Sequence, residues 1–325
     1  MTAMPRPSLL LIMPAFCLLA CFVTRASAAD WPARVFAPYM YVGADDNFQL
    51  AQCDQACGQK YYTLAFIIAD PHANPAWDGR FPVEKNFFAS QIAAIRRLGG
   101  DVIVSFGGEG GTELALADHD AISLQAKYQA VIDRYKLSWL DFDIEGDALS
   151  NQEANAHRNT ALAALQKTNP RLIISYTLPV DPSGLSGDSQ KLLTDAKARG
   201  LNVSSVNIMT MYFGVEFFSK GKTMSDLSIA SALKAHDQCA QIDPAITLGL
   251  TPCIGQNGDS SQIFSEEDAR ALEKWASGQP WVSSLSFWCS NRDAGRPNEG
   301  NDSTFSGVAQ KPWAFTLIFQ PFTAR

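Results

Sequence analysis

Three carboxylates alternate along one short apolar run, LSWLDFDIEGDAL, which covers residues 137–149. Asp141, Asp143 and Glu145 would share one face of a strand, because a strand sends successive side chains to opposite faces. Burying acids is unfavourable unless they find partners, and neighbouring like charges raise one another's pKa. Such a face can hold a proton at neutral pH. We predict that Glu145, the last acid, is a general acid; a purely structural acid network is the alternative.

Short apolar runs alternate with stretches of helical periodicity along the chain beyond residue 30. The runs predict buried strands at 35–42, 61–69, 102–106, 137–144, 172–178, 206–212, 246–251 and 282–288. The periodic stretches predict helices at 88–97, 121–135, 151–168, 189–198, 226–238 and 266–276. Eight strands alternating with helices predict an α/β fold, a single (β/α)8 TIM barrel.

An open, doubly wound sheet would show the same alternation of strands and helices. That fold usually carries a glycine-rich phosphate loop after its first strand, and residues 37–41 read Ala-Pro-Tyr-Met-Tyr instead. Polar and aromatic residues here follow many different strands. This distribution favours a barrel, whose site is assembled at the C-terminal ends of its strands.

The composition indicates a packed, acidic protein. Apolar residues make up 46% of the 325 residues and charged residues 18%, which argues against disorder. The net charge is −7 and the isoelectric point about 5.1, with no basic run to neutralise phosphates. These values exclude nucleic acid as the expected partner and favour a neutral or polar small molecule.

The N-terminal segment has the order of a secretory signal peptide. Arg6 precedes an apolar stretch at 9–23, and Ala26-Ser27-Ala28 follows as a small-residue cleavage site. We expect a signal peptide at 1–28, one catalytic barrel at 29–325, export from the cell, no stable membrane span, and a monomer. Lipid anchoring at Cys21 is a minor alternative, because Leu18-Leu19-Ala20-Cys21 resembles a lipobox.

Five cysteines remain once that segment is removed, and an odd number leaves at least one free thiol in an oxidising compartment. Cys53 and Cys57 lie four residues apart, and Cys239 and Cys253 would close a small loop; the pairing of these four and Cys289 stays open. The four histidines do not fall at ligand spacing from the cysteines, so we expect no metal and no other cofactor.

The spacing Asp141-x-Asp143-x-Glu145 resembles the D-x-x-D-x-D-x-E signature of family 18 glycoside hydrolases, with Ser138 in place of the first aspartate. Nearly the whole chain beyond residue 30 takes part in the resemblance. Its other landmarks are Phe36-Ala37-Pro38-Tyr39, residues 64–70, Ser105-Phe106-Gly107-Gly108, residues 206–211, Ser286-Phe287-Trp288 and Asn291-Arg292-Asp293, as in bacterial chitinases.

The resemblance implies a retaining glycosidase that cleaves β-1,4-linked N-acetylglucosamine polymers, chitin or its oligosaccharides. The acetamido oxygen of the substrate attacks the anomeric carbon, and a glutamate protonates the leaving oxygen and later activates water. By position Glu145 is that glutamate. Asp143 orients the acetamido group, and Asp141 is its inner partner.

The resemblance also implies the residues that bind substrate. Trp288 would form the floor under the distorted sugar, since a pyranose ring stacks on an indole. A glycine at position 107 makes physical sense whether or not the residue binds substrate, because the absence of Cβ permits a close approach of backbone or sugar. The other substrate-binding residues are Tyr39, Ser105, Met209, Met211 and Tyr212.

One departure from the family pattern bears on activity. Bacterial relatives usually show M-D-Y-G after the sixth strand, and this chain reads Met211-Tyr212-Phe213-Gly214. The loss of that aspartate keeps two alternatives open: a catalytically weak or inactive chitin-binding, lectin-like protein, and an endo-N-acetylglucosaminidase acting on N-glycans. The sequence does not distinguish endo from exo action.

Overall fold

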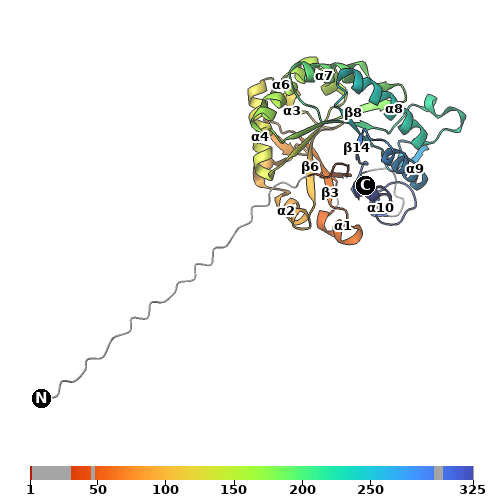
Figure 1. Ribbon diagram of the computed structural model, residues 1–325, viewed down its shortest axis with the longest axis horizontal. Coiled ribbons are helices and arrows are strands. Elements are labelled where there is room, and N and C mark those ends of the chain that lie inside the picture. The colour runs from red at the N-terminus through yellow and green to blue at the C-terminus, as the bar shows by residue number, and fades with distance from the viewer. Residues whose placement is uncertain (2–30, 45–47, 296–302, 325) are drawn as a thin grey trace.

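A computed structural model describes residue 1 and residues 31–44, 48–295 and 303–324 (Figure 1). The signal peptide expected at 1–28 and the lipobox cysteine Cys21 lie outside the described residues, apart from residue 1. The central feature is a ring of parallel strands, and all eight predicted strands are confirmed. Around the ring they are β1 (Val35–Phe36) with β2 (Tyr39–Tyr41), β3 (Tyr61–Ala69), β6 (Asp101–Gly107), β7 (Trp139–Asp143), β8 (Ile173–Asp181), β10 (Ser205–Met209), β11 (Thr247–Thr251) and β14 (Val282–Leu285).

The first strand is split, and its two halves close the barrel. β1 pairs with β14, so that Val35 lies opposite Ser284, whereas β2 pairs with β3, so that Tyr39 lies opposite Thr63. The break falls at Pro38, which has no N–H to give to the ladder. Its carbonyl oxygen accepts a hydrogen bond from the N–H of Thr63 at 3.0 Å. The segment 35–41 thus joins both edges of the sheet, as a (β/α)8 barrel requires.

The helices cover the outside of the ring (Figure 1). The six predicted helices are confirmed with small shifts at their ends: α2 (Ala89–Arg97), α4 (Ala121–Tyr135), α6 (Gln152–Thr168), α7 (Gly187–Ala198), α8 (Met224–Ile242) and α9 (Glu266–Ser277). The shorter elements beside them are α1 (Leu50–Cys57), α3 (Leu114–Ala117), α5 (Gly146–Ser150), α10 (Ala314–Phe319), the 3-10 turns η1 (Val83–Lys85), η2 (Val215–Gly221), η3 (Ser290–Ala294) and η4 (Gln320–Ala324), and the strands β4 (Pro75–Trp77), β5 (Phe81–Pro82), β9 (Gly184–Leu185), β12 (Gly255–Asn257) and β13 (Asp259–Phe264). Among the described residues, no helix is long and apolar enough to cross a bilayer.

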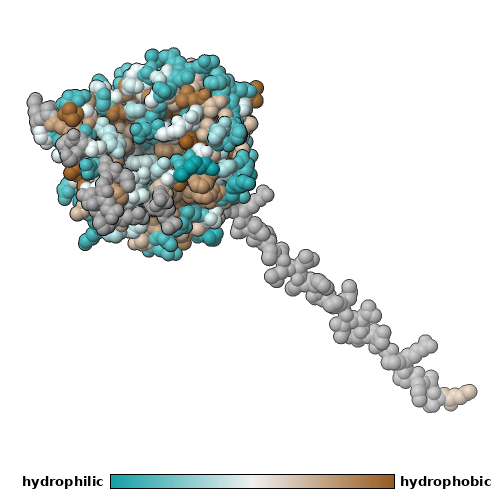
Figure 2. Space-filling model, turned by 180° about the vertical axis from the view of Figure 1, so that it is seen from behind, coloured by the Kyte–Doolittle hydropathy of each residue, from teal (hydrophilic) through white to brown (hydrophobic). Residues whose placement is uncertain are grey.

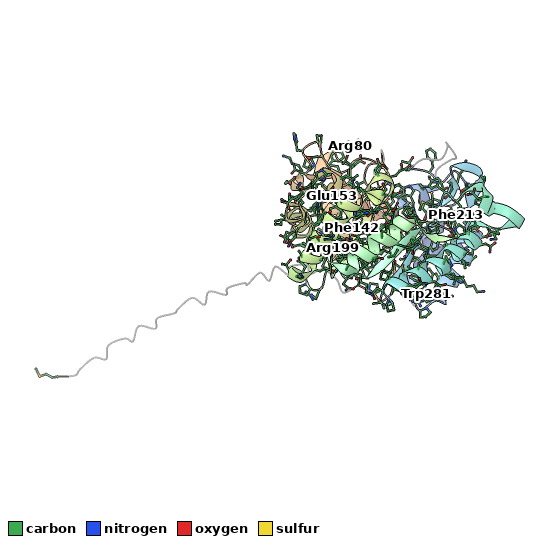
Figure 3. The ribbon with its side chains drawn as sticks, turned by 90° about the horizontal axis from the view of Figure 1, so that it is seen from above. Arg80, Phe142, Glu153, Arg199, Phe213 and Trp281 are labelled. Carbon is green, nitrogen blue, oxygen red and sulfur yellow. The ribbon has the colours of Figure 1, made fainter. Side chains whose placement is uncertain are left out.

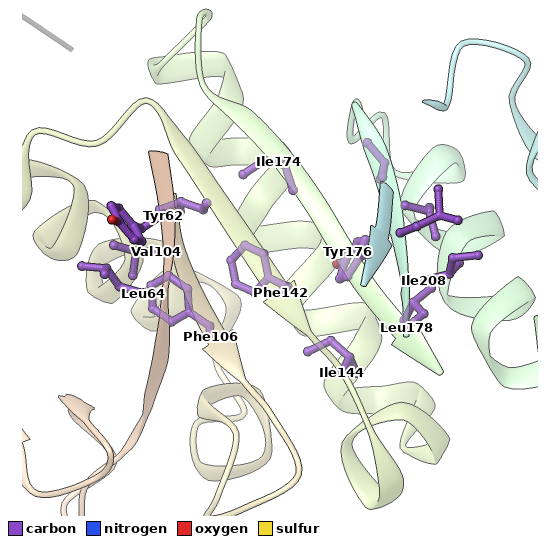
Figure 4. Packing of buried hydrophobic residues seen from close by; sticks show 14 of the residues in the cluster. Tyr62, Leu64, Val104, Phe106, Phe142, Ile144, Ile174, Tyr176, Leu178 and Ile208 are labelled. Carbon is purple, nitrogen blue, oxygen red and sulfur yellow. The ribbon is translucent and has the colours of Figure 1, made fainter. Parts of the chain in front are cut away.

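The main apolar core lies between the strands and the helices (Figure 4). Phe142 of β7 is fully buried there and stacks on Phe106 of β6, with ring centroids 5.1 Å apart. The ring of Tyr128 from α4 meets Phe142 edge-on at 5.2 Å. Because side chains alternate along β7, packing Phe142 outward directs Asp141 and Asp143 into the barrel. On the face shown in Figure 2, hydrophilic side chains are interspersed with apolar ones.

A buried ion pair joins α6 to the segment that follows β6. Nε and Nη2 of Arg158 donate to the two carboxylate oxygens of Glu113, at 3.2 and 2.7 Å, and the Arg158 side chain is fully buried. Glu113 also caps α3 by accepting a hydrogen bond from the N–H of Ala115 at 2.8 Å. This pair fixes the end of the glycine-rich loop 107–111.

Replacing Arg158 with Met will lower the free energy of unfolding by about 3–5 kcal/mol, because Glu113 is left as an unpaired buried charge. Urea unfolding of the purified protein measures the change. The matched control is Lys191→Met, which removes the exposed pair with Asp188 and will cost less than about 1 kcal/mol. Equal losses in the two variants would contradict the prediction.

Candidate active site

A cleft of about 1040 Å³ opens at the C-terminal ends of the barrel strands. Of the sequence-predicted site residues, Asp143 and Glu145 line it together with Tyr39, Gly107, Met209, Met211, Tyr212 and Trp288. Its other lining residues are Tyr41, Phe66, Ile68, Asp78, Glu109, Gly110, Gly111, Thr177, Pro179, Val180, Thr251, Arg292 and Ser303. Two predicted residues, Asp141 and Ser105, lie beneath the cleft.

Asp141 is the innermost acid of the ladder and is held by hydroxyl groups. One carboxylate oxygen accepts hydrogen bonds from Ser105 at 2.7 Å and from Tyr39 at 3.0 Å. The other accepts a bond from Ser175 at 2.7 Å, and Thr177 lies 3.0 Å from both oxygens. Burial raises the pKa of Asp141, and these hydrogen bonds partly offset that rise. Among the described residues no cationic side chain pairs with Asp141, so these hydrogen bonds are what stabilise its ionised form.

Asp143 lies one step further along β7 and faces the cleft. Its side chain is buried, and one carboxyl oxygen has no hydrogen-bond partner among the described residues. Burial, followed by the negative charges of Glu145 and Asp141, raises the pKa of Asp143 well above its usual range. The protonated form is therefore favoured, and it donates a hydrogen bond to Glu145. The free oxygen is available to a donor from a bound molecule.

Glu145 follows the end of β7, where the backbone is still extended before α5 begins. Burial, followed by the negative charge of Glu109, raises the pKa of Glu145 to about 7. The hydrogen bond from Asp143 acts in the opposite direction. A carboxyl group with this pKa exchanges a proton readily near neutral pH, which suits a general acid and base.

Aromatic rings form one wall of the cleft. Trp288 stacks on Phe66 with centroids 5.7 Å apart and ring planes 10° apart. Tyr41 meets Trp288 at 5.5 Å and Tyr39 meets it at 6.0 Å. An apolar ring surface beside a pair of carboxyl groups is the arrangement expected of a sugar-binding site, because pyranose rings stack on aromatic faces.

The chain is similar in sequence to two curated proteins, although no family model matches it. It is 30% identical over 316 residues to a probable bifunctional chitinase/lysozyme of Escherichia coli (strain K12), covering 90% of this chain and 35% of that protein. It is 30% identical over 258 residues to endochitinase 11 of Metarhizium anisopliae, covering 74% of this chain and 49% of that protein. The chain thus spans half or less of the length of both relatives.

A solved structure covers almost the whole barrel. Active domain 2 of a chitinase from Pyrococcus furiosus, crystallised as catalytic-site mutants, is 32% identical to this chain. The superposition covers 92% of this chain and 97% of that one, with a TM-score of 0.82. The chain belongs to the family 18 glycoside hydrolases.

The structure explains two residues of the segment Ser105-Phe106-Gly107-Gly108, which lies at the end of β6, the third strand of this family 18 barrel. Ser105, predicted to bind substrate, is fully buried and does not line the cleft; its hydroxyl donates to Asp141 and so supports the inner acid. Gly107 lines the cleft with φ +96°, and a Cβ there would lie 2.1 Å from the carbonyl oxygen of Asp143. Any larger residue would push β6 away from the acid ladder.

Tyr212, the departure from the family 18 pattern, adopts a left-handed conformation with φ +49°. This conformation is unusual for a bulky residue. Its N–H donates to the side-chain oxygen of Asn257 at 3.3 Å, and its hydroxyl lies 3.8 Å from the Cys253 sulfur. Its side chain is 54% exposed at the cleft, whereas Phe213 is buried. A tyrosine ring therefore faces the cleft at the position for which the family pattern predicts an aspartate.

Several cleft residues were not predicted from the sequence, and the turn between β4 and β5 supplies one of them. Trp77 does not extend the cleft: it is fully buried and its indole N–H donates to the Tyr135 hydroxyl at 2.8 Å. The next residue, Asp78, reaches the cleft instead and accepts a hydrogen bond from the Tyr41 hydroxyl at 3.1 Å. Arg80, at the edge of the molecule (Figure 3), pairs with Asp78 at 2.5 Å.

Within the described ranges, no group of three or more His, Cys, Asp or Glu residues is placed so that it could hold a metal ion. Arg292 reaches the cleft from η3, and its guanidinium donates to the carbonyl oxygens of Ile254 and Gln256, each at 2.9 Å.

Glu109→Gln will lower the pKa of Glu145 from its value of about 7, because a negative charge near the carboxyl group is removed. Glu145 will then lose its proton at lower pH. A ¹³C NMR titration of the Glu145 carboxyl, assigned with the Glu145→Gln variant, measures the shift. Glu84→Gln, an exposed charge outside the cleft, is the control and will leave the titration unchanged. An unchanged pKa in Glu109→Gln refutes the electrostatic role of Glu109.

Proposed function

We propose that the protein is a retaining chitinase that uses the acetamido group of its substrate as the nucleophile. This proposal rests mainly on the hydrogen-bonded pair Asp143 and Glu145, which lies at the floor of a cleft with an aromatic wall. The two curated relatives are named as a probable bifunctional chitinase/lysozyme and an endochitinase. Catalytic-site mutants of the Pyrococcus domain were crystallised with chito-oligosaccharides. These names support chitin or its oligosaccharides as substrate.

The proposed reaction begins with one proton shared by Asp143 and Glu145. Transfer of that proton to Glu145 leaves Asp143 as a carboxylate, whose unpartnered oxygen accepts the acetamido N–H of the sugar. Glu145 protonates the glycosidic oxygen as the acetamido oxygen attacks the anomeric carbon and the glycosidic bond breaks. The Glu145 carboxylate then removes a proton from water, which opens the oxazolinium ion with retention.

Asp141 and the aromatic wall support this reaction but take no part in the proton transfer. The hydroxyl groups around Asp141 favour its ionised form, and its negative charge raises the pKa of Asp143. Trp288 offers its indole face to the distorted sugar, next to Phe66. Each role is assigned from position in the cleft together with the family mechanism.

A lectin-like function is the second candidate, because Tyr212 stands where relatives carry an aspartate. In that case the cleft would bind chitooligosaccharides and not cleave them. Retention of both Asp143 and Glu145 favours hydrolysis, since these two groups are the ones that the chemistry needs.

We also propose that the chain is exported and that residues 1–28 are its signal peptide, leaving a single catalytic barrel at 29–325 that acts as a monomer. The basic, apolar and small-residue order of the first 28 residues supports this proposal. The insoluble, extracellular nature of a chitin substrate agrees with it.

Glu145→Gln will abolish turnover of a chitooligosaccharide, with kcat lower by at least about 100-fold, because the amide can neither donate nor accept the required proton. Binding by isothermal titration calorimetry will persist, since the shape of the side chain is unchanged. Proton NMR of the wild-type reaction will show the β-anomer as first product. If the wild type binds the oligosaccharide yet turns over no faster than the variant, the lectin-like function is correct.

Tyr212→Asp will raise turnover about tenfold, because a charge-assisted hydrogen bond to the sugar is restored. Aspartate tolerates the left-handed backbone of this position better than tyrosine does. Tyr212→Asn is the matched control, with the same backbone tolerance and no charge, and will give a smaller gain. Unchanged turnover in the aspartate variant would remove position 212 from the working site.

A further inference from the structure

Two cysteines lie one turn apart on α1, away from the cleft. The Cys53 and Cys57 sulfur atoms are 3.4 Å apart, and the Cys57 thiol also lies 3.0 Å from the carbonyl oxygen of Cys53. Cys53 is 1% exposed and packs in the main apolar core, whereas Cys57 is partly accessible. One sulfur is therefore anchored and the other can be reached from solvent.

The other three described cysteines are fully buried and lie on separate elements. Cys239 is in α8, Cys253 follows β11 and Cys289 follows β14. A bond between Cys239 and Cys253, one of the pairings that the sequence left open, is not formed: both are free thiols and the Cys253 sulfur faces the Tyr212 hydroxyl. Among these five cysteines, only the pair on α1 combines short separation with access to a reagent.

The end of α1 permits the small movement that a covalent bond requires. Residues four apart in a helix have Cα atoms about 6 Å apart, within the range that disulfides span. Cys57 is the last residue of α1, and Gly58 follows in a left-handed conformation with φ +78°. We propose that Cys53 and Cys57 form an intrachain disulfide, so that α1 carries a covalent modification site.

The two sulfurs differ in reactivity because their surroundings differ. The hydrogen bond from Cys53 lowers the pKa of Cys57, whereas that hydrogen bond together with burial raises the pKa of Cys53. The Cys57 thiolate attacks one sulfur of a small-molecule disulfide and releases one thiolate. Cys53 then loses its proton and attacks the Cys57 sulfur of the mixed disulfide, which releases the second thiolate. Two protein thiols are oxidised and one external disulfide is reduced to two thiols.

The bond would reinforce a helix that has little stability of its own. α1 has eight residues, and Gln49 at its start provides no side-chain cap. The carbonyl oxygen of Cys57 accepts a hydrogen bond from Gln320 near the C-terminus at 3.0 Å. A disulfide in the last turn fixes this attachment point. The proposal is independent of the hydrolase function, because neither sulfur lines the cleft.

Exposure of the native, reduced protein to oxidised glutathione tests the proposal. After alkylation without reduction, the tryptic peptide 35–60 contains both cysteines and will be lighter by two hydrogen atoms than its reduced form, with no alkyl group attached. Cys239→Ser, a buried cysteine outside the pair, is the matched control and will give the same peptide. Cys57→Ser will leave Cys53 free and alkylatable after denaturation.

Two results would overturn the proposal. One is a wild-type peptide in which both cysteines are still alkylated after the glutathione step. The other is a Cys57–glutathione mixed disulfide that persists with Cys53 free, which would show that the buried sulfur cannot reach its neighbour. Circular dichroism of each variant before oxidation confirms that the fold is intact.

Discussion

The burial of acids inside the barrel is the constraint on which the rest of the site depends. No cationic side chain in the part of the chain that the structure describes pairs with Asp141, and its desolvation is offset by four hydroxyl groups from β2, β6 and β8. These hydroxyls come from the strands on both sides of β7 and from the strand that closes the barrel. The barrel therefore has to be complete before its inner acid is stabilised. Asp143 lacks such a set of donors, so its protonated form is favoured.

The three acids differ in their hydrogen bonding and pKa according to their depth in the barrel. The innermost acid is saturated with hydrogen bonds, the middle one keeps a free oxygen, and the outermost reaches the cleft with a pKa near neutrality. The same side-chain type thus serves three purposes because depth in the barrel changes its surroundings. Glu109 adds a charge from a neighbouring loop, and the Arg158–Glu113 ion pair holds the end of that loop.

The sequence predicted the barrel and the acid ladder because both depend on short-range periodicity. The α4 boundaries agree with the predicted helix at both ends, and Asp141 and Asp143 face inward as the period of two requires. Phe66 was not foreseen as a cleft residue, since the pairing of β3 with β6 shifts register between Ala65 and Ile67, and this local irregularity is invisible in the residue pattern. Asp78 reaches the cleft through a hairpin turn with φ +52°, and Trp77 beside it is core. Such placements are set by tertiary contacts.

The split first strand links the two ends of the described chain. Val35 and Phe36 pair with β14, near residue 285, while Tyr39 and Tyr41 pair with β3 and line the cleft. A ribosome or a translocation channel releases the N-terminal part long before β14 emerges. During that interval Tyr39 has no closed barrel to hold it against Asp141, and the aromatic wall lacks Trp288. The catalytic centre therefore forms only after nearly the whole barrel has been synthesised, so a partly synthesised chain has no active site.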